Sequence, residues 1–101
     1  MSEKIELTSG FIEFYQVDDF ADIHNVEVQV ECRGKGYGAK LLELFLSEMG
    51  SRGVTVITLE VRADNVAAIS LYEKFGFKHA AVRKGYYADG CDALLMRLDN
   101  S

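Results

Sequence analysis

The N-terminal third of the chain carries the alternating apolar and polar pattern that is typical of β-strands. Residues 11–17 are rich in aromatic and β-branched side chains, and two aspartates end the run. Residues 21–30 follow as a second strand. Turn-forming residues occupy positions 8–10, so residues 5–7 are expected to form a short strand in front of the other two.

In the middle of the chain the apolar residues change to a helical period. The first helical face consists of Leu41, Leu42, Phe45, Leu46 and Met49. Gly50 or Gly53 is expected to end this helix, because glycine readily adopts the left-handed conformation that follows many helices. Residues 54–61 come next and are the clearest strand of the chain.

A second helix is expected to begin at Asp64 or Asn65, either of which can cap it, and to stop at Gly76. Its apolar stripe consists of Ala68, Leu71, Tyr72 and Phe75. Residues 77–87 and 91–98 are then predicted to form a closing antiparallel hairpin around an Asp-Gly turn.

The predicted order is therefore β-β-β-α-β-α-β-β, which indicates an α/β fold, or α+β, with one mixed sheet and helices packed on it. The two strands that flank the first helix can be joined as a right-handed parallel crossover. With 101 residues, the chain (residues 1–101) is expected to be a single domain.

Composition narrows the classes of function. A net charge of −5 argues against a nucleic-acid-binding protein, which would present a basic face. No apolar run approaches the ~20 residues of a membrane span, and the N-terminus lacks the layout of a signal peptide, so a cytoplasmic protein without membrane contact is expected. Cys32 and Cys91 do not have the spacing of metal ligands, and no metal site is predicted.

A glycine-rich loop joins the second strand to the first helix. It consists of Arg33, Gly34, Lys35, Gly36, Tyr37, Gly38 and Ala39. The first N–H groups of a helix have no partner within the helix and attract anions, and the two basic side chains could add bonds to phosphate. Such loops are also often plain turns. The spacing fits neither the phosphate loop of nucleotide hydrolases nor the dinucleotide fingerprint.

The pattern Arg33-x-x-Gly36-x-Gly38 resembles the motif by which GNAT N-acetyltransferases hold the pyrophosphate of coenzyme A. Three further segments resemble the RimI-like branch of that family, which acetylates protein α-amino groups. They are LEVRADN at 59–65, AAISLYEKFGF at 67–77, and RKGYY at 83–87 with DALLM at 92–96. Together these segments run in the family's order from about residue 11 to residue 98, and they imply a GNAT-like acyl-CoA N-acyltransferase fold.

The resemblance implies that Glu60 is the general base, directly or through a water, and that Tyr72 protonates the departing thiolate of acetyl-CoA. Strand alternation places Glu60 on the face opposite Ile57, Leu59 and Val61. Tyr72 lies about two turns into the next helix and can face the same cleft. The residues alone also allow a solvated strand carboxylate and a packed helix tyrosine.

The resemblance extends to the binding residues. It implies that the backbone of Val26, Glu27 and Val28 pairs with the pantetheine arm, that Asn65 contacts the cofactor, and that Tyr86 and Tyr87 lie near the amine acceptor. Helix capping explains Asn65 equally well, and packing at a hairpin end is an equal alternative for the two tyrosines. His24 and His79 are expected to be ordinary strand residues.

The sequence departs from the family's pattern at its N-terminal end. Family members carry a strand and two helices before the first long strand, whereas only residues 1–10 precede that strand here. The uncovered strand edge predicts a homodimer or a partner subunit. Two functions follow. The first is acetyl transfer from acetyl-CoA to an amine, in particular a protein N-terminus; the alternative is an acyl-CoA-binding half-domain that is inactive alone and acts in a dimer or complex.

Overall fold

The computed structural model describes residues 2–7, 9–28 and 36–99 and contains the eight elements in the predicted order. The elements are β1 (Ser2–Leu7), β2 (Gly10–Val17), β3 (Phe20–Val28), α1 (Tyr37–Ser51), β4 (Val56–Arg62), α2 (Val66–Lys74), β5 (Lys78–Arg83) and β6 (Ala93–Asp99). Neither described helix combines the length and the apolar character that a membrane span requires.

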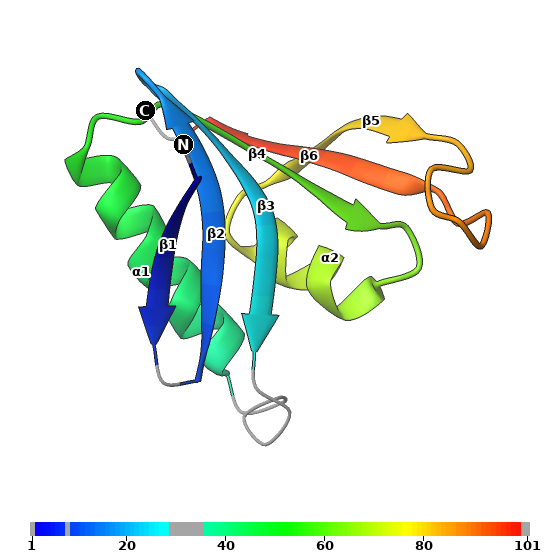
Figure 1. Ribbon diagram of the computed structural model, residues 1–101, viewed down its shortest axis with the longest axis horizontal. Helices are drawn as coiled ribbons and strands as arrows, with labels where there is room; N and C mark the ends of the chain where they lie inside the picture. The colour runs from blue at the N-terminus through cyan, green and yellow to red at the C-terminus, as the bar shows by residue number, and fades with distance from the viewer. Residues whose placement is uncertain (1, 8, 29–35, 100–101) are drawn as a thin grey trace.

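The six strands form one mixed sheet in the order β1-β2-β3-β4-β6-β5 (Figure 1). All neighbours are antiparallel except β3 and β4, which confirms the parallel connection across α1 and the closing antiparallel hairpin. The parallel pairing is short and joins Phe20–Ile23 of β3 to Val56–Leu59 of β4. Beyond these residues the two strands diverge, as Figure 1 shows.

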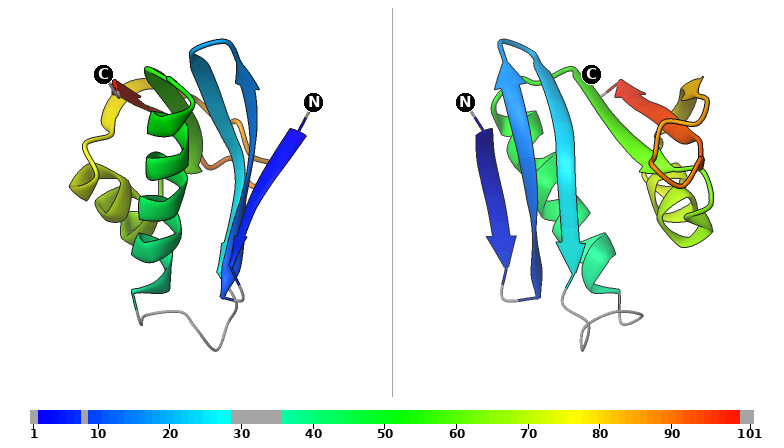
Figure 2. Two further views of the ribbon diagram at one scale, coloured as in Figure 1. Left: turned by 90° about the vertical axis from the view of Figure 1, so that its left-hand side faces the viewer. Right: turned by 45° about the vertical axis from the view of Figure 1, so that its right-hand side comes forward.

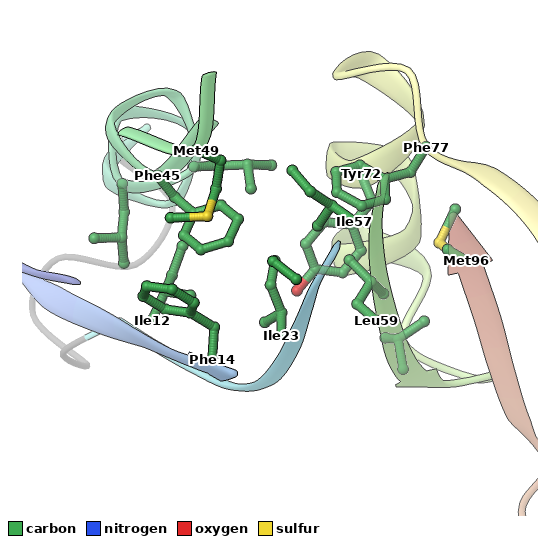
Figure 3. Close-up of a cluster of buried hydrophobic side chains, with 14 of the residues drawn as sticks. Ile12, Phe14, Ile23, Phe45, Met49, Ile57, Leu59, Tyr72, Phe77 and Met96 are labelled. Carbon is green, nitrogen blue, oxygen red and sulfur yellow. The ribbon is translucent and has the colours of Figure 1, made fainter. Parts of the chain in front are cut away.

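Both helices cover the same face of the sheet (Figure 2). They do so because side chains alternate between the two faces of each strand, and the apolar side chains gather on one face. In β4, Ile57, Leu59 and Val61 are buried, while the residues between them are partly exposed. Phe14 of β2 meets Phe45 of α1 edge to face, with ring centroids 5.0 Å apart. Figure 3 shows these side chains in one continuous apolar layer with those of α2 and β6.

The predicted helix ends are confirmed in part. Gly50 lies within α1, and Gly53, with a φ of 77°, takes the left-handed position after it. Of the two candidate caps of α2, Asn65 is the one used, since its side-chain oxygen accepts the N–H of Ala68 at 3.2 Å. Gly76, with a φ of 95°, follows the end of α2.

Four predicted strand boundaries are wrong by at least two residues. The first strand begins at Ser2 rather than residue 5, and the last begins at Ala93 rather than residue 91. The predicted end of another strand, at residue 30, lies outside the described residues. The fourth strand begins at Val56 rather than Val54, because the N–H of Val54 bonds to the carbonyl of Met49 and closes the turn after α1. The fifth strand ends at Arg83 rather than at residue 87. Just beyond Arg83, the N–H of Gly85 donates a hydrogen bond to the carboxylate of Asp92 at 2.9 Å. This N–H therefore bonds to a side chain instead of continuing the backbone pairing with β6.

Candidate active site

The divergence of β3 and β4 opens the site. Between Glu13 and Phe14 the register of β2 against β3 shifts, and His24 remains as an extra residue on β3. A β-bulge of this kind bends its strand, which accounts for the departure of β3 from β4 directly after Ile23. The resulting gap holds a cavity of about 350 Å³. Its lining residues are Ile23, His24, Asn25, Val26, Leu59, Glu60, Val61, Arg62, Asn65, Ala68, Tyr72 and Tyr87.

A second cavity, of about 400 Å³, adjoins the first. Its lining residues are Asp22, Ile23, His24, Glu60, Arg83, Tyr86, Tyr87 and Leu95. The first cavity reaches α2, while the second takes its distinct wall from β5, β6 and the loop between them. The two cavities share Ile23, His24, Glu60 and Tyr87, so they meet where β3 and β4 separate.

Glu60, the predicted general base, lies at this meeting point. Its side chain is 27% exposed, and its Oε2 atom lies 2.6 Å from Nε of Arg83. The contact is an ion pair without hydrogen-bond geometry, and the described residues supply no other donor to this buried oxygen. A carboxylate oxygen in this situation can accept a hydrogen bond from the N–H of an amine.

Tyr72, the predicted general acid, lines the first cavity together with Glu60, so the structure brings the two predicted catalytic residues together. The tyrosine is 8% exposed and packs edge to face on Phe77, with ring centroids 5.8 Å apart. In Figure 3 its phenol oxygen points from α2 toward Ile23, where β3 leaves β4. Burial raises the pKa of the Tyr72 phenol, which therefore keeps its proton at neutral pH.

The predicted cofactor residues are only partly brought together. Val26 and Asn65 line the first cavity, while Glu27 and Val28 lie farther along β3. The capping bond of Asn65 to Ala68 confirms its structural role and leaves a cofactor contact as a prediction.

The start of α1 supplies the described part of the glycine loop. Gly36 is the N-cap, with a φ of 79° and no side-chain cap, and Tyr37, Gly38 and Ala39 form the first turn. Among the described residues, nothing lies within 4 Å of a Cβ atom added at Gly36. The predictions for Arg33, Gly34 and Lys35 concern positions outside the described residues.

The predicted acceptor residues, Tyr86 and Tyr87, both line the second cavity. Their rings meet edge to face at 5.2 Å, and each ring lies under a guanidinium group: Arg83 is 5.4 Å from Tyr86, and Arg62 is 4.8 Å from Tyr87. Burial and the nearby charge of Glu60 raise the pKa of Tyr87.

Sequence reasoning missed four ionisable residues of the site. Asp22, His24 and Arg83 line the cavities, and Arg62 carries ring and ion-pair contacts there. His24 was expected to be an ordinary strand residue, yet it lines both cavities, with Nε2 3.2 Å from the hydroxyl of Ser2. Strand alternation does not reveal a bulge, so no signal marked His24. Arg83 belongs to a motif segment but had no assigned role.

Comparison with known proteins agrees with this architecture. Residues 8–77 match the model of the Acetyltransferase (GNAT) family, and the chain belongs to this family. The [ribosomal protein bS18]-alanine N-acetyltransferase of Escherichia coli is 45% identical over 83 residues, which are 79% of this chain and 56% of that protein. An N-alpha-acetyltransferase of Saccharolobus solfataricus is 48% identical over 73 residues, 71% of this chain and 44% of that protein.

Solved structures show the same fold. The crystal structure of the ribosomal-protein-S18-alanine N-acetyltransferase from Escherichia coli superposes with a TM-score of 0.88 and 42% identity, covering 92% of this chain and 62% of that one. The predicted GNAT-like fold is thereby confirmed. The chain spans just over half the length of the Escherichia coli relative, 56% by sequence.

Proposed function

We propose that this chain binds acetyl-CoA in the cavity between β3 and β4 and transfers the acetyl group to an amine in the adjoining cavity, in particular to a protein N-terminal α-amino group. The observation that carries this proposal is the meeting of two cavities at Glu60, with Tyr72 on the wall of the first. A transferase needs two binding sites that share the point of reaction. Two relatives are named for activity on the alanine of a ribosomal protein and on α-amino groups, which supports this choice of acceptor. A ribosomal protein as acceptor would also agree with a cytoplasmic location.

The donor side has two parts in this proposal. The pyrophosphate binds at the start of α1, where Gly36 allows close approach and the helix dipole favours negative charge. Arg33, Gly34 and Lys35 complete this loop as the sequence predicts. The pantetheine arm then runs along β3 into the gap near Asn25 and Val26, where β3 no longer pairs with β4.

The transfer follows from the placement of the two ionisable groups. The acceptor nitrogen attacks the thioester carbonyl carbon, and Glu60 accepts the proton that the nitrogen releases. The tetrahedral intermediate then collapses, the C–S bond breaks, and Tyr72 gives its proton to the sulfur. A free α-amino group has a pKa of ~7.7–8.0, so a carboxylate suffices as the base near neutral pH. A backbone N–H of β3 near Val26 would polarise the carbonyl oxygen.

Titration of acetyl-CoA by calorimetry tests the donor site, with ATP and desulfo-CoA as controls for specificity. Gly36→Val is expected to weaken binding at least tenfold, since a side chain would stand where the phosphates approach the first helical N–H groups. Gly53→Val is the matched control: Gly53 flanks the other end of α1 with nearly the same φ, 77° against 79°, and also has open space around it. Both variants carry the same backbone strain of about 1–2 kcal/mol.

Equal loss of affinity in the two variants would show that backbone strain, and not the phosphate site, is responsible. Failure of the unsubstituted chain to bind acetyl-CoA at millimolar concentration would refute the donor site.

A second candidate function is an acyl-CoA-binding half-domain that works only in an assembly. The face of the sheet opposite the helices favours it, because Tyr15, Val17 and Phe20 lie there with 48%, 66% and 41% exposure. In the sheet that the described residues form, β1 is an edge strand next to β2. A homodimer or a partner subunit would cover both features.

Sedimentation equilibrium tests this association. We expect the apparent mass of the chain to rise toward that of a dimer with increasing concentration, and Tyr15→Lys to shift the midpoint to higher concentration. A monomer at every concentration would refute a homodimer.

A further inference from the structure

Arg62 occupies a junction that the transfer chemistry does not use. It is the last residue of β4, two positions after Glu60 and on the same face of the strand. Its Nε atom lies 3.2 Å from Oδ1 of Asp64, and its Nη2 atom lies 2.6 Å from Oδ2 of Asp89. The ring of Tyr87 lies 4.8 Å from the same guanidinium. One side chain therefore contacts three others.

These contacts join two separate segments of the chain. Asp64 belongs to the turn that leads into α2, whereas Asp89 and Tyr87 belong to the loop between β5 and β6. The second oxygen of Asp89 accepts the N–H of Cys91 at 3.1 Å, and the N–H of Tyr87 bonds to the carbonyl of Cys91. The ion pair between Arg62 and Asp89 therefore also restrains the backbone at Tyr87.

An ordinary surface ion pair would do less. Exposed ion pairs contribute little to stability, and many contribute nothing measurable. Arg97 provides the comparison in this chain, because it also pairs with an aspartate two residues ahead, with Nε 3.1 Å from Asp99. Arg62 adds to this local pair a distant carboxylate and a stacked ring, for which a planar guanidinium is suited.

Charge state supports the same picture. Hydrogen bonds from Arg62 hold the pKa values of Asp64 and Asp89 below their usual range. Both carboxylates are therefore ionised at neutral pH. The guanidinium remains charged, since the two aspartates raise its pKa further.

We propose that Arg62 is a positioning residue for acceptor binding: it holds the loop at residues 84–92 so that Tyr87 forms the wall between the two cavities beside Glu60. The inference rests on the proposed function, because Tyr87 borders both cavities and a wall between donor and acceptor has value only if both bind there. Arg62 acts through Tyr87, whose ring meets that of Tyr86, and Tyr86 lines the acceptor cavity and not the donor cavity. We therefore expect the loss of Arg62 to affect binding of the acceptor more than binding of acetyl-CoA.

Three measurements on Arg62→Met test the proposal, with Arg97→Met as the matched control. Methionine keeps an apolar stem but removes the charge and the planar donor group. Amide hydrogen exchange at Tyr87, Gly90 and Cys91 is expected to be at least tenfold faster than in the unsubstituted chain. With an N-terminal peptide as acceptor, kcat/KM is expected to fall about 10- to 100-fold. The fall should come mainly through KM for the peptide, because a displaced Tyr87 removes part of the wall of the acceptor cavity. Affinity for acetyl-CoA is expected to stay within twofold.

Two further variants separate positioning from general loss of stability. Arg62→Lys keeps the charge without the planar group and is expected to restore less than half of the lost exchange protection. Asp89→Asn removes the carboxylate with which Arg62 pairs in the loop. The double variant of Arg62→Met and Asp89→Asn is expected to exchange little faster than either single variant, because both substitutions break the same ion pair.

The proposal is overturned if exchange and peptide KM in Arg62→Met match those of Arg97→Met. Equal losses of peptide and acetyl-CoA affinity would also overturn it, since Arg62 would then serve the donor cavity it lines. If the unsubstituted chain transfers no acetyl group, the proposed function of the chain alone fails. In that case unchanged loop exchange in Arg62→Met would still refute the positioning role, and faster exchange would support it.

Discussion

Replacing Tyr72 by phenylalanine is expected to lower the rate of acetyl transfer by about 100- to 10,000-fold, the range found for loss of a general acid or base. The substitution removes one oxygen from a side chain that is 8% exposed and keeps the ring that packs on Phe77. Acetyl-CoA affinity should therefore remain within twofold. Steady-state kinetics with an N-terminal peptide, together with calorimetry of acetyl-CoA, measure the two quantities separately.

Tyr15→Phe is the control for this prediction, because Tyr15 is 48% exposed on β2 and is not among the residues that line the two cavities. Phenylalanine also keeps the ring, whose centroid lies 4.6 Å from that of His24. It should leave turnover unchanged. Equal turnover in Tyr72→Phe and the unsubstituted chain would exclude Tyr72 as the acid. Binding of acetyl-CoA without turnover in the unsubstituted chain would instead favour the half-domain function.

Tyr72 also predicts a dependence of stability on pH. Burial raises the pKa of its phenol in the folded chain above the value of ~10 that holds in the unfolded chain. Above pH ~10 the unfolded chain therefore loses this proton first, and the free energy of unfolding falls as pH rises through the folded-state pKa. The fall should be shallower in Tyr72→Phe, as measured by urea unfolding at pH 9 to 11.

Replacing Gly10 by alanine is expected to lower the free energy of unfolding by about 1–3 kcal/mol, the usual cost of forcing atoms into a packed site. Gly10 begins β2 and is buried against β3. A Cβ atom there would overlap the carbonyl oxygen of Glu27 and lie 2.9 Å from the Cα atom of Val28. Both are backbone atoms, so the strands themselves must move apart.

Gly50→Ala is the matched control, because Gly50 lies in α1 with open space around it. That substitution should stabilise the chain by about 0.5–1 kcal/mol, since alanine favours a helix over glycine. Urea unfolding of both variants measures the difference. A neutral Gly10→Ala would show that β2 and β3 can separate without cost. Because the clash falls on residues 27 and 28, acetyl-CoA affinity in Gly10→Ala also reports whether this part of β3 contributes to the cofactor site.

Local pattern accounts for what could be predicted about the fold. The alternation of residues 56–62 predicts which side of β4 is buried, and the helical spacing around Phe45 predicts the buried face of α1. The ends of elements were less predictable. At Val54 the N–H bonds to the carbonyl of Met49 in the turn that ends α1, and at Gly85 the N–H bonds to a side-chain oxygen of Asp92. Neither N–H is therefore free to join the strand ladder.

The candidate site divides in the same way. The family motifs single out Glu60 and Tyr72, and the structure places both on one cavity. Arg83 and Arg62 were found only in three dimensions. Arg83 reaches Glu60 across 23 positions of the chain (83 minus 60), and Arg62 reaches Asp89 across 27.

The sequence by itself determined the order of the elements, the buried faces of β4 and α1, and the family motifs, because these depend on neighbours along the chain and on residue identity. The tertiary structure alone decided where β3 leaves β4, how the gap becomes two adjoining cavities, and which charged side chains border them. The physical reason is that one extra residue at His24 shifts the register between strands. The effect of that shift depends on which strands lie next to β3 in the sheet, and not on the residues next to His24 in the sequence.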